Sequence, residues 1–383
     1  MKNFLTNIFF PASVFFQIFT LNLEADGFRR IEELNPHIPL TCRTVFSEVS
    51  DDALVNRVVS AYQLAYKQHL GNSMWQLFFD QKHYPIHQIF EGGQLDKAAL
   101  ILRNPGSTDL FYGIDNLASS LLPLYASYEY TINMTITCMD SLLRFGEAIG
   151  AVTLDNPEGY YNPPRSWDVA SLIEKLESHL NVTLNFPNPY PDEFGLWTSR
   201  GVVSYRVPQA LYQAYLIKTL VKGIKNPRVL EIGAGVGRTA YYARLFGIND
   251  YTIIDIPMTG ACSGYFLGRT LGEEAILLLG ETCNNPENRV KILTPNQFIN
   301  NFDQKYDLII NVDSLTEMDI SVARSYVSTI ENITPIFVSI NHEVNPFTTR
   351  QLINQCSNVK NIKRSPYWMR HGYVEEIVEF EVQ

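Results

Sequence analysis

The sequence predicts an α/β protein in which a doubly wound, mainly parallel sheet follows a mainly helical N-terminal region. From residue 228 onward, short apolar runs that each end at a polar residue alternate with segments of helical periodicity, the pattern of buried strands joined by crossover helices. The first run leads into glycines at every second position, which indicates a strand–turn–helix corner. The runs are RVLEIG, DYTIIDI, RVKIL, YDLIINV and PIFVSIN, and NIKRSPYW and VEEIVEFEV are expected to close the sheet as antiparallel strands.

Residues 1–195 form the mainly helical region. Leu54, Val58 and Tyr62 recur at helical spacing within 51–70, and a second amphipathic helix is expected to begin at Ser166. A proline-rich segment before residue 195, NFPNPYPDEF, is expected to be an extended connector. The sequence therefore divides into residues 1–195 and 196–383, and the first part is expected to supply acceptor specificity, contacts in a homo-oligomer, or both.

Composition and charge exclude several classes of protein. The formal net charge of -10 argues against a basic surface for nucleic acid. The 5 cysteines are widely spaced and include no CxxC pair, so they predict free thiols in a reducing compartment rather than a disulfide framework or a zinc site. We therefore expect a cytoplasmic protein.

The first 21 residues allow three interpretations. A lysine followed by apolar residues resembles a weak signal peptide or an interfacial anchor. Asn7, Pro11 and Gln17 interrupt the stretch, and its uninterrupted apolar runs are too short to span a bilayer. We therefore expect a helix that packs on the protein itself or on a partner, without membrane contact.

The glycine turn and its neighbouring carboxylates indicate a nucleotide-type cofactor. Gly233, Gly235 and Gly237 follow the strand 228–232 and let the backbone approach a ligand closely. Asp255 ends the next strand, about where ribose hydroxyls would lie. Glu231 directly precedes the turn, where a carboxylate would repel a pyrophosphate and favour a ligand that carries ammonium and sulfonium charges. S-adenosylmethionine (SAM) fits this arrangement better than NAD(P), whose usual turn is G-x-G-x-x-G.

These residues also carry a family resemblance. RVLEIGAGVGRTAYYA resembles the first motif of class I SAM-dependent methyltransferases, E/D-x-G-x-G-x-G. The longer run that continues to YFLGRTLGEE, together with SLTEMD and SINHE, resembles the bacterial sugar O-methyltransferases over residues 205–383. The resemblance implies a Rossmann-like fold, SAM as cofactor and a sugar hydroxyl as acceptor.

The resemblance also assigns roles to residues around the cofactor. It implies that Glu231 orients the methionine amino group, that the three glycines pass beneath the methionyl and ribose portions, and that Asp255 binds the ribose hydroxyls. Ile256 would lie against the adenine, and Asn296 or Gln297 would contact the adenine amine. Arg206, just before the sheet, is a candidate partner for the SAM carboxylate or for an acceptor phosphate.

Methyl transfer to a sugar hydroxyl calls for a general base, because the hydroxyl is a poor nucleophile at neutral pH. His342, at the end of the fifth strand, is the first candidate, since its pKa suits the task. Asp313 is the second, and it could instead bind SAM or a substrate hydroxyl. Glu317 is the third, with a helix-capping role as its alternative. A metal scheme is also open, in which Asp313, Asn341 and Glu343 hold Mg²⁺ against two sugar hydroxyls.

The sequence thus predicts a SAM-dependent O-methyltransferase that acts on a sugar or a glycosylated metabolite. Two alternatives stay open: a methyltransferase for a non-sugar, phenolic natural product, and a non-catalytic subunit that binds SAM or a partner. An NAD(P)-dependent oxidoreductase is disfavoured by Glu231 and by the spacing of the glycines.

Overall fold

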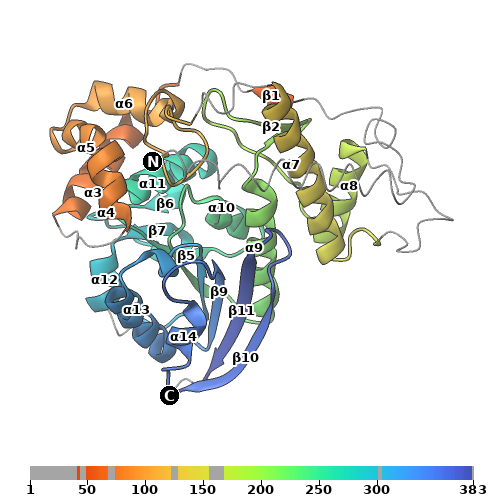
Figure 1. Ribbon diagram of the computed structural model, residues 1–383. Coiled ribbons are helices and arrows are strands. Elements are labelled where there is room, and N and C mark those ends of the chain that lie inside the picture. Colours follow the sequence, from red (N-terminus) through yellow and green to blue (C-terminus); the bar gives the residue numbers. More distant parts are fainter. Residues whose placement is uncertain are drawn as a thin grey trace.

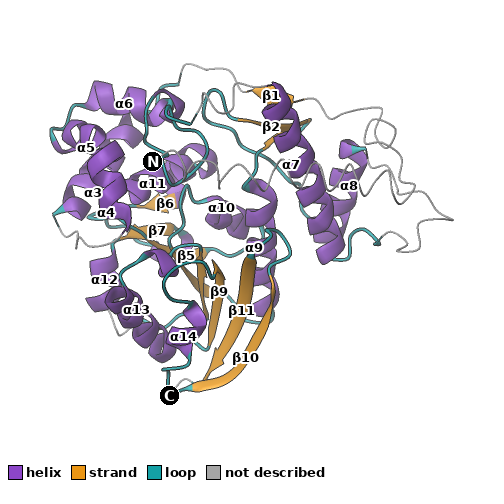
Figure 2. Ribbon diagram, in the orientation of Figure 1, coloured by secondary structure: helices purple, strands orange, loops and turns teal. Residues whose placement is uncertain are grey.

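The computed structural model describes residues 41–43, 49–67, 74–121, 128–154, 168–300 and 304–381. The segment 1–21 and Ser166 lie outside these ranges, so the expectations for them stay predictions. An eight-stranded sheet runs through the C-terminal half, with helices on both faces (Figures 1 and 2). No helix in these ranges is long and apolar enough to cross a membrane.

The order of the strands in this sheet is β10–β11–β9–β8–β4–β5–β7–β6. The strands from β9 to β6 pair in parallel, whereas β11 is antiparallel to both β9 and β10. The predicted doubly wound sheet with an antiparallel closing pair is therefore confirmed, and the short strand β6 was not predicted. The bounds are β4 (Arg228–Ile232), β5 (Asp250–Ile254), β6 (Ile276–Leu277), β7 (Val290–Leu293), β8 (Leu308–Val312), β9 (Ile336–His342), β10 (Val359–Pro366) and β11 (Tyr373–Phe380).

Alternating side chains of the strands build two hydrophobic layers, one on each face of the sheet. On β4, Val229 belongs to one buried cluster, and Leu230 and Ile232 belong to the other. This alternation follows from the two-residue repeat of a strand. One layer is completed by α9 (Val207–Leu220), α10 (Arg238–Leu245) and α11 (Pro257–Leu271), and the other by α12 (Pro295–Asn300), α13 (Ile320–Ile333) and α14 (Thr349–Ile353).

The described part of the N-terminal region is mainly helical, as predicted. Asp168 caps α8 by accepting a hydrogen bond from the Ser171 backbone N–H at 3.0 Å. The exception is a small sheet, β1 (Thr41–Arg43), β2 (Phe194–Thr198) and β3 (Gly201–Val203); β2 spans residue 195, where the sequence suggested a connector. The helices are α3 (Asp52–Tyr66), α4 (Met74–Phe78), α5 (Tyr84–Glu91), α6 (Leu95–Arg103), α7 (Tyr128–Ala148) and α8 (Val169–Leu180).

The helices α3 to α6 pack on the sheet half through α11, and α7 and α8 lie to one side (Figure 1). Gly268 allows α3 and α11 to approach closely, because a Cβ at this position would lie 2.5 Å from a methyl group of Leu54. Buried polar contacts reinforce the packing: the Tyr265 hydroxyl donates to Asp51 at 2.6 Å, and the Arg103 guanidinium donates to the same carboxylate at 2.8 Å. The N-terminal helices are therefore held beside the edge of the sheet at which ligands bind in such folds.

Candidate active site

A cavity of about 450 Å³ opens beyond the carboxyl ends of β4, β5 and β8. The chain runs from β4 to β5 on one side and continues to β8 on the other, so the cavity lies where the order of the strands reverses. Such a switch point is where open α/β sheets bind ligands. Of the predicted site residues, those that line the cavity are Arg206, Glu231, Gly233, Gly235, Asp255, Ile256, Asp313 and Glu317.

The three glycines of the turn are all required by its backbone. Gly233, Gly235 and Gly237 have φ angles of 76°, 58° and 93°, in the left-handed region that other residues rarely adopt. A Cβ on Gly233 would also lie 2.2 Å from the hydroxyl oxygen of Ser314. Gly237 precedes α10 as its N-cap and is not part of the cavity wall. The turn therefore brings bare backbone to the cavity at Gly233 and Gly235.

Glu231 is a buried carboxylate at the base of this turn. Its side chain accepts a hydrogen bond from the Tyr251 hydroxyl at 2.9 Å, and the residue is 2% exposed. Burial raises the pKa of Glu231 to about 7, although hydrogen bonds from Tyr251 and Thr239 act in the opposite direction. A cationic ligand group in the cavity would stabilise the ionised form of this carboxyl.

Asp255 faces the same turn from the end of β5. Its two oxygens accept hydrogen bonds from backbone N–H groups, from Ile256 at 2.8 Å and from Gly235 at 3.3 Å. The pKa of Asp255 is raised to about 7. Burial is the largest cause and the charge of Glu231 adds to it, whereas the backbone hydrogen bonds act in the opposite direction. The carboxyl is thus fixed in orientation and tied to the glycine turn.

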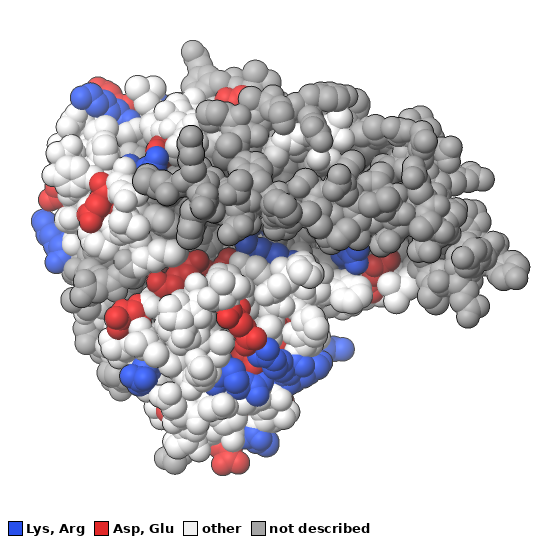
Figure 3. Space-filling view, in the orientation of Figure 1, with Lys and Arg blue, Asp and Glu red and all other residues white. Residues whose placement is uncertain are grey.

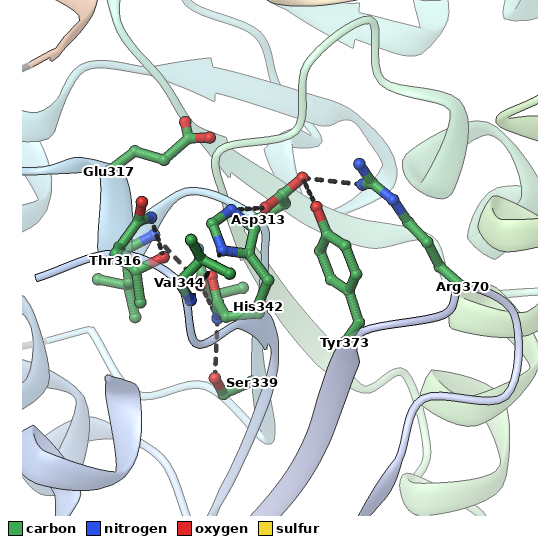
Figure 4. Close-up of polar contacts among 12 residues, drawn as sticks. Asp313, Thr316, Glu317, Ser339, His342, Val344, Arg370 and Tyr373 are labelled. Atoms are coloured by element: carbon green, nitrogen blue, oxygen red, sulfur yellow. Dashed lines mark hydrogen bonds and ion pairs between the residues drawn. The ribbon is translucent and has the colours of Figure 1, made fainter. Parts of the chain in front are cut away.

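At the other end of the cavity, Asp313 is the centre of a polar network (Figure 4). One oxygen, Oδ2, accepts a hydrogen bond from the Tyr373 hydroxyl at 2.7 Å and one from Arg370 at 2.9 Å. The His342 ring nitrogen Nε2 lies 3.5 Å from the other oxygen, Oδ1. Asp313 also has a φ of 53°, a left-handed conformation that is unusual for a residue with a side chain and that clusters at functional sites.

His342 is close to this network but does not line the cavity. Its Nδ1 accepts a long hydrogen bond, 3.4 Å, from the Val344 backbone N–H, and its ring packs edge-on against Tyr373. Its Nε2 faces Asp313 Oδ1. Both ring nitrogens of the first candidate base are therefore directed at protein groups.

Glu317 lies on a short 3₁₀ turn after β8 and lines the cavity. Trp75, from α4 of the N-terminal region, donates its indole N–H to Glu317 Oε2 at 3.1 Å. Burial raises the pKa of Glu317 to about 7, and the nearby charge of Asp313 adds to the increase, whereas Trp75, Arg206 and Arg370 lower it. The third candidate base is thus a cavity-facing carboxyl with an anchored side chain.

The residues expected to hold Mg²⁺ are not brought together. Glu343 forms a two-pronged ion pair with Arg364, at 2.8 Å and 2.9 Å, and Asn341 donates its amide to Asn311 at 2.9 Å. A different set converges instead, because Asp313, Glu317 and His342 each place one oxygen or nitrogen atom within 4.8 Å of the others. The Arg370 cation already pairs with Asp313 at 2.9 Å and opposes a second cation there, so these residues do not fit a Mg²⁺ site.

Gln297 is directed back to its own helix rather than to the cavity. Its side-chain oxygen accepts hydrogen bonds from the Thr294 backbone N–H at 2.9 Å and from the Thr294 hydroxyl at 3.0 Å. This arrangement gives the Thr294 backbone N–H, at the start of α12, a hydrogen-bond acceptor. Ile256, by contrast, lines the cavity beside Pro295 and Ile299, which gives the expected adenine end an apolar wall.

Part of the cavity wall comes from residues that sequence reasoning missed. Trp75 and the segment 113–115 of the N-terminal region line the cavity, and Ile114 lies beside Gly235 of the glycine turn. Asp115 forms an ion pair with Arg238, the first residue of α10, which also contacts Glu193 at 2.9 Å. No motif marks these residues, and only a tertiary contact brings them to the turn.

Several charged side chains outside the cavity form ion pairs. On the face drawn in Figure 3, Lys and Arg are interspersed with Asp and Glu over the sheet half. Arg364, for example, lies between Glu343 at 2.8 Å and Glu376 at 3.2 Å. The four cysteines whose side chains are described, Cys138, Cys262, Cys283 and Cys356, are free thiols.

The mixed, mainly parallel sheet with helices on both faces is a Rossmann-like, doubly wound fold. No protein-family model and no curated protein matches the chain. Distant similarity to solved structures covers less than half of it. The glycopeptide N-methyltransferase MtfA in complex with sinefungin is 14% identical over 45% of this chain and 94% of that chain, with a TM-score of 0.33.

Two further structures are similar to the same extent. The methyltransferase domain of bacterial CtHen1-CN is 9% identical over 44% of this chain and 100% of that chain, with a TM-score of 0.32. The PH0226 protein from Pyrococcus horikoshii OT3 is 12% identical over 43% of this chain and 88% of that chain, with a TM-score of 0.33. Similarities as distant as these identify neither the reaction nor the substrate of this protein.

Proposed function

We propose that this protein is a SAM-dependent O-methyltransferase whose acceptor is a hydroxyl of a sugar or a glycosylated metabolite. The observation that carries the proposal is a pair of carboxyls on either side of a glycine turn at the cavity wall: Glu231, which is buried, and Asp255, which is partly buried. A dinucleotide pyrophosphate would meet like charge at this turn, whereas the ammonium and ribose hydroxyls of SAM would meet acceptors.

In the proposed complex, SAM lies in the cavity in a single orientation. Glu231 receives the methionine ammonium, Asp255 receives the ribose hydroxyls, and the adenine lies among Ile256, Pro295 and Ile299. Arg206 is directed at Gln209, with 3.5 Å between Nη1 and Oε1, and it also lines the cavity, so its guanidinium is available to the SAM carboxylate. The sulfonium methyl group then points toward Asp313 and Glu317, where the acceptor hydroxyl binds.

The acceptor end supports transfer to oxygen. Carboxyls at Asp313 and Glu317 can receive a hydroxyl proton and bind neighbouring hydroxyls, as a polyol ring requires. Trp75 adds an aromatic wall from the N-terminal region, which supports a role of that region in acceptor specificity. The formal net charge of -10 gives no support to a nucleic-acid acceptor. A phenolic acceptor is the second candidate, because the same aromatic wall suits a planar ring.

Calorimetry tests the donor site. The protein should bind SAM and S-adenosylhomocysteine, and NAD should give no heat of binding. Glu231→Gln and Asp255→Asn should each weaken the binding of S-adenosylhomocysteine at least about tenfold, which corresponds to the loss of one charge-assisted hydrogen bond. Glu287→Gln, at an exposed position of the short 3₁₀ helix Pro286–Asn288, is the matched control and should leave the affinity unchanged. Unchanged affinity in both cavity variants would refute the proposed donor site.

A methyl-transfer assay tests the acceptor. Methyl groups from radiolabelled SAM should appear on nucleotide sugars or simple glycosides, and Trp75→Ala should reduce this transfer more than it reduces SAM binding. Transfer to phenols alone would assign the second candidate. An enzyme that binds SAM but methylates neither class would support the non-catalytic alternative.

A further inference from the structure

We propose that Glu317 receives the proton of the acceptor hydroxyl, and that Trp75 of the N-terminal region holds the Glu317 carboxyl in place for this step. The proposal rests on the proposed methyl transfer and names the base for it. It differs from the sequence-based expectation, in which His342 was the first candidate.

Access to the cavity separates the three candidate groups. Glu317 and Asp313 line the cavity, whereas His342 does not. A general base must come within hydrogen-bonding distance of the proton that it removes. His342 would have to turn away from both Asp313 and the Val344 backbone N–H to meet an acceptor. The geometry therefore favours one of the two carboxyls.

The hydrogen bonds to the two carboxyls give them different roles. Asp313 Oδ2 receives hydrogen bonds from Arg370 and Tyr373, and a cation and a phenol that donate to one oxygen stabilise the carboxylate. Glu317 receives one hydrogen bond, from the neutral Trp75 indole to Oε2, and none reaches its Oε1 from the described residues. Asp313 Oδ2 is thus occupied by two protein donors, and Glu317 offers Oε1 to a ligand.

The environment of Glu317 suits proton transfer at neutral pH. The charged groups around it are Asp313 at the end of β8, Arg206 before α9 and Arg370 before β11. Together with burial, they leave the pKa of Glu317 near 7, where a base is strong enough to take a proton and is still partly ionised.

Trp75 is a positioning residue in this scheme. Its indole N–H fixes Oε2 of Glu317 at 3.1 Å, and its ring packs edge-on against Phe78, with 5.5 Å between the ring centroids. Gly113 lies beside the same indole, because a Cβ there would be 3.4 Å from it. The orientation of the base is therefore set by a part of the chain that the methyltransferase fold does not include.

The proposed step transfers one methyl group to the acceptor oxygen and one proton from it. The acceptor oxygen attacks the methyl carbon in line with the carbon–sulfur bond, and that bond breaks with its electron pair on sulfur. The sulfonium becomes the neutral thioether of S-adenosylhomocysteine, and the hydroxyl proton moves to Glu317 Oε1. Solvent removes this proton after the methylated product leaves, which restores the carboxylate.

The test compares Glu317→Gln with His342→Gln on the same probes: nucleotide sugars, simple glycosides and a series of phenols of increasing acidity, each with radiolabelled SAM. Glu317→Gln should lower kcat about 10²- to 10⁴-fold, the usual contribution of a general base. His342→Gln should lower it less than about tenfold. Both variants should bind S-adenosylhomocysteine within threefold of the unaltered protein.

Acceptor acidity separates a chemical role from a structural one. If Glu317 takes the proton, the deficit of Glu317→Gln shrinks toward the most acidic phenols, which are already ionised and need no base. Trp75→Phe should lower kcat with little effect on SAM binding, and it should cause no further loss when Glu317→Gln is present.

The outcomes distinguish the assignment of Glu317 as the base from the proposed methyltransferase function. A kcat of Glu317→Gln within threefold of the unaltered protein, or a larger loss in His342→Gln, would overturn the assignment of the base while leaving methyl transfer intact. A deficit of Glu317→Gln that does not change with acceptor acidity would also overturn it. No transfer to any probe by the unaltered protein, with S-adenosylhomocysteine bound normally, would count against the proposed function itself.

Discussion

Replacing Gly233 with alanine should damage both stability and donor binding, because two independent features of the turn exclude a side chain. The φ of 76° places alanine in the left-handed region, at a cost of about 1–2 kcal/mol. The new Cβ would also lie 2.2 Å from Ser314 Oγ, so Ser314 must move. Ser314 donates to the Ile232 carbonyl at 3.0 Å, and losing that hydrogen bond costs about 1 kcal/mol more.

The two costs together predict a decrease of about 2–3 kcal/mol in the free energy of unfolding. Gly247→Ala is the matched control, since Gly247 has a φ of 92° but no atom within 4 Å of its Cβ position, so it should lose only about 1–2 kcal/mol. Urea unfolding of the ligand-free protein measures both values. Because the turn also forms the cavity wall, Gly233→Ala should weaken the binding of S-adenosylhomocysteine more than tenfold, and Gly247→Ala should not.

A second substitution makes the comparison stricter. Ser314→Gly removes the atoms that collide with Cβ, so it should recover part of the stability lost in Gly233→Ala, while the cost of the left-handed conformation stays. Equal losses of stability in the Gly233 and Gly247 variants, or no recovery with Ser314→Gly, would refute the contact between the turn and the end of β8.

The remaining predictions concern charge and helix capping. Because burial raises the pKa values of Glu231 and Asp255 to about 7, both carboxyls gain protons as the pH falls below 7. SAM affinity should therefore decrease by up to about tenfold per pH unit for each carboxyl between pH 7 and 5.5 in calorimetry. The same raised values mean that the folded, ligand-free protein binds more protons than the unfolded chain, and its stability should therefore decrease as the pH rises from 5 to 7, as urea unfolding would show. Arg238→Gln leaves two buried carboxylates without their cation and should cost about 3–5 kcal/mol in urea unfolding, whereas Arg144→Gln at an exposed ion pair should cost less than about 1 kcal/mol. Asp168→Ala removes the N-cap of α8 and should cost about 1 kcal/mol, measured in the same way.

The sheet could be predicted from the sequence because its signals are local. Each parallel strand is a short apolar run, and its burial on both faces leaves little room for polar side chains. The glycine turn could be predicted for a similar reason, since its positive φ angles admit few other residues. Strand β6 was missed because two residues, Ile276 and Leu277, carry no periodicity.

The polar residues of the site were harder to predict, because the direction of a side chain depends on its competing partners. Gln297 lies where the sequence suggested an adenine contact, but its side-chain oxygen accepts a hydrogen bond from the Thr294 backbone N–H instead. Glu343 follows the correct strand end, yet Arg364 on β10 binds it. Trp75 reaches the cavity only because α3 and its neighbours pack on α11, a contact that no local pattern encodes.

The place of β11 in the sheet has a consequence for biosynthesis. This strand pairs with β9 on one side and with β10 on the other, although both precede it in the chain. Arg370 and Tyr373, which hold Asp313, emerge from the ribosome together with it. A nascent chain can therefore assemble the glycine turn and its flanking strands first, but the acceptor end of the cavity is completed only when residues 370–380 have been translated and inserted between two strands already made.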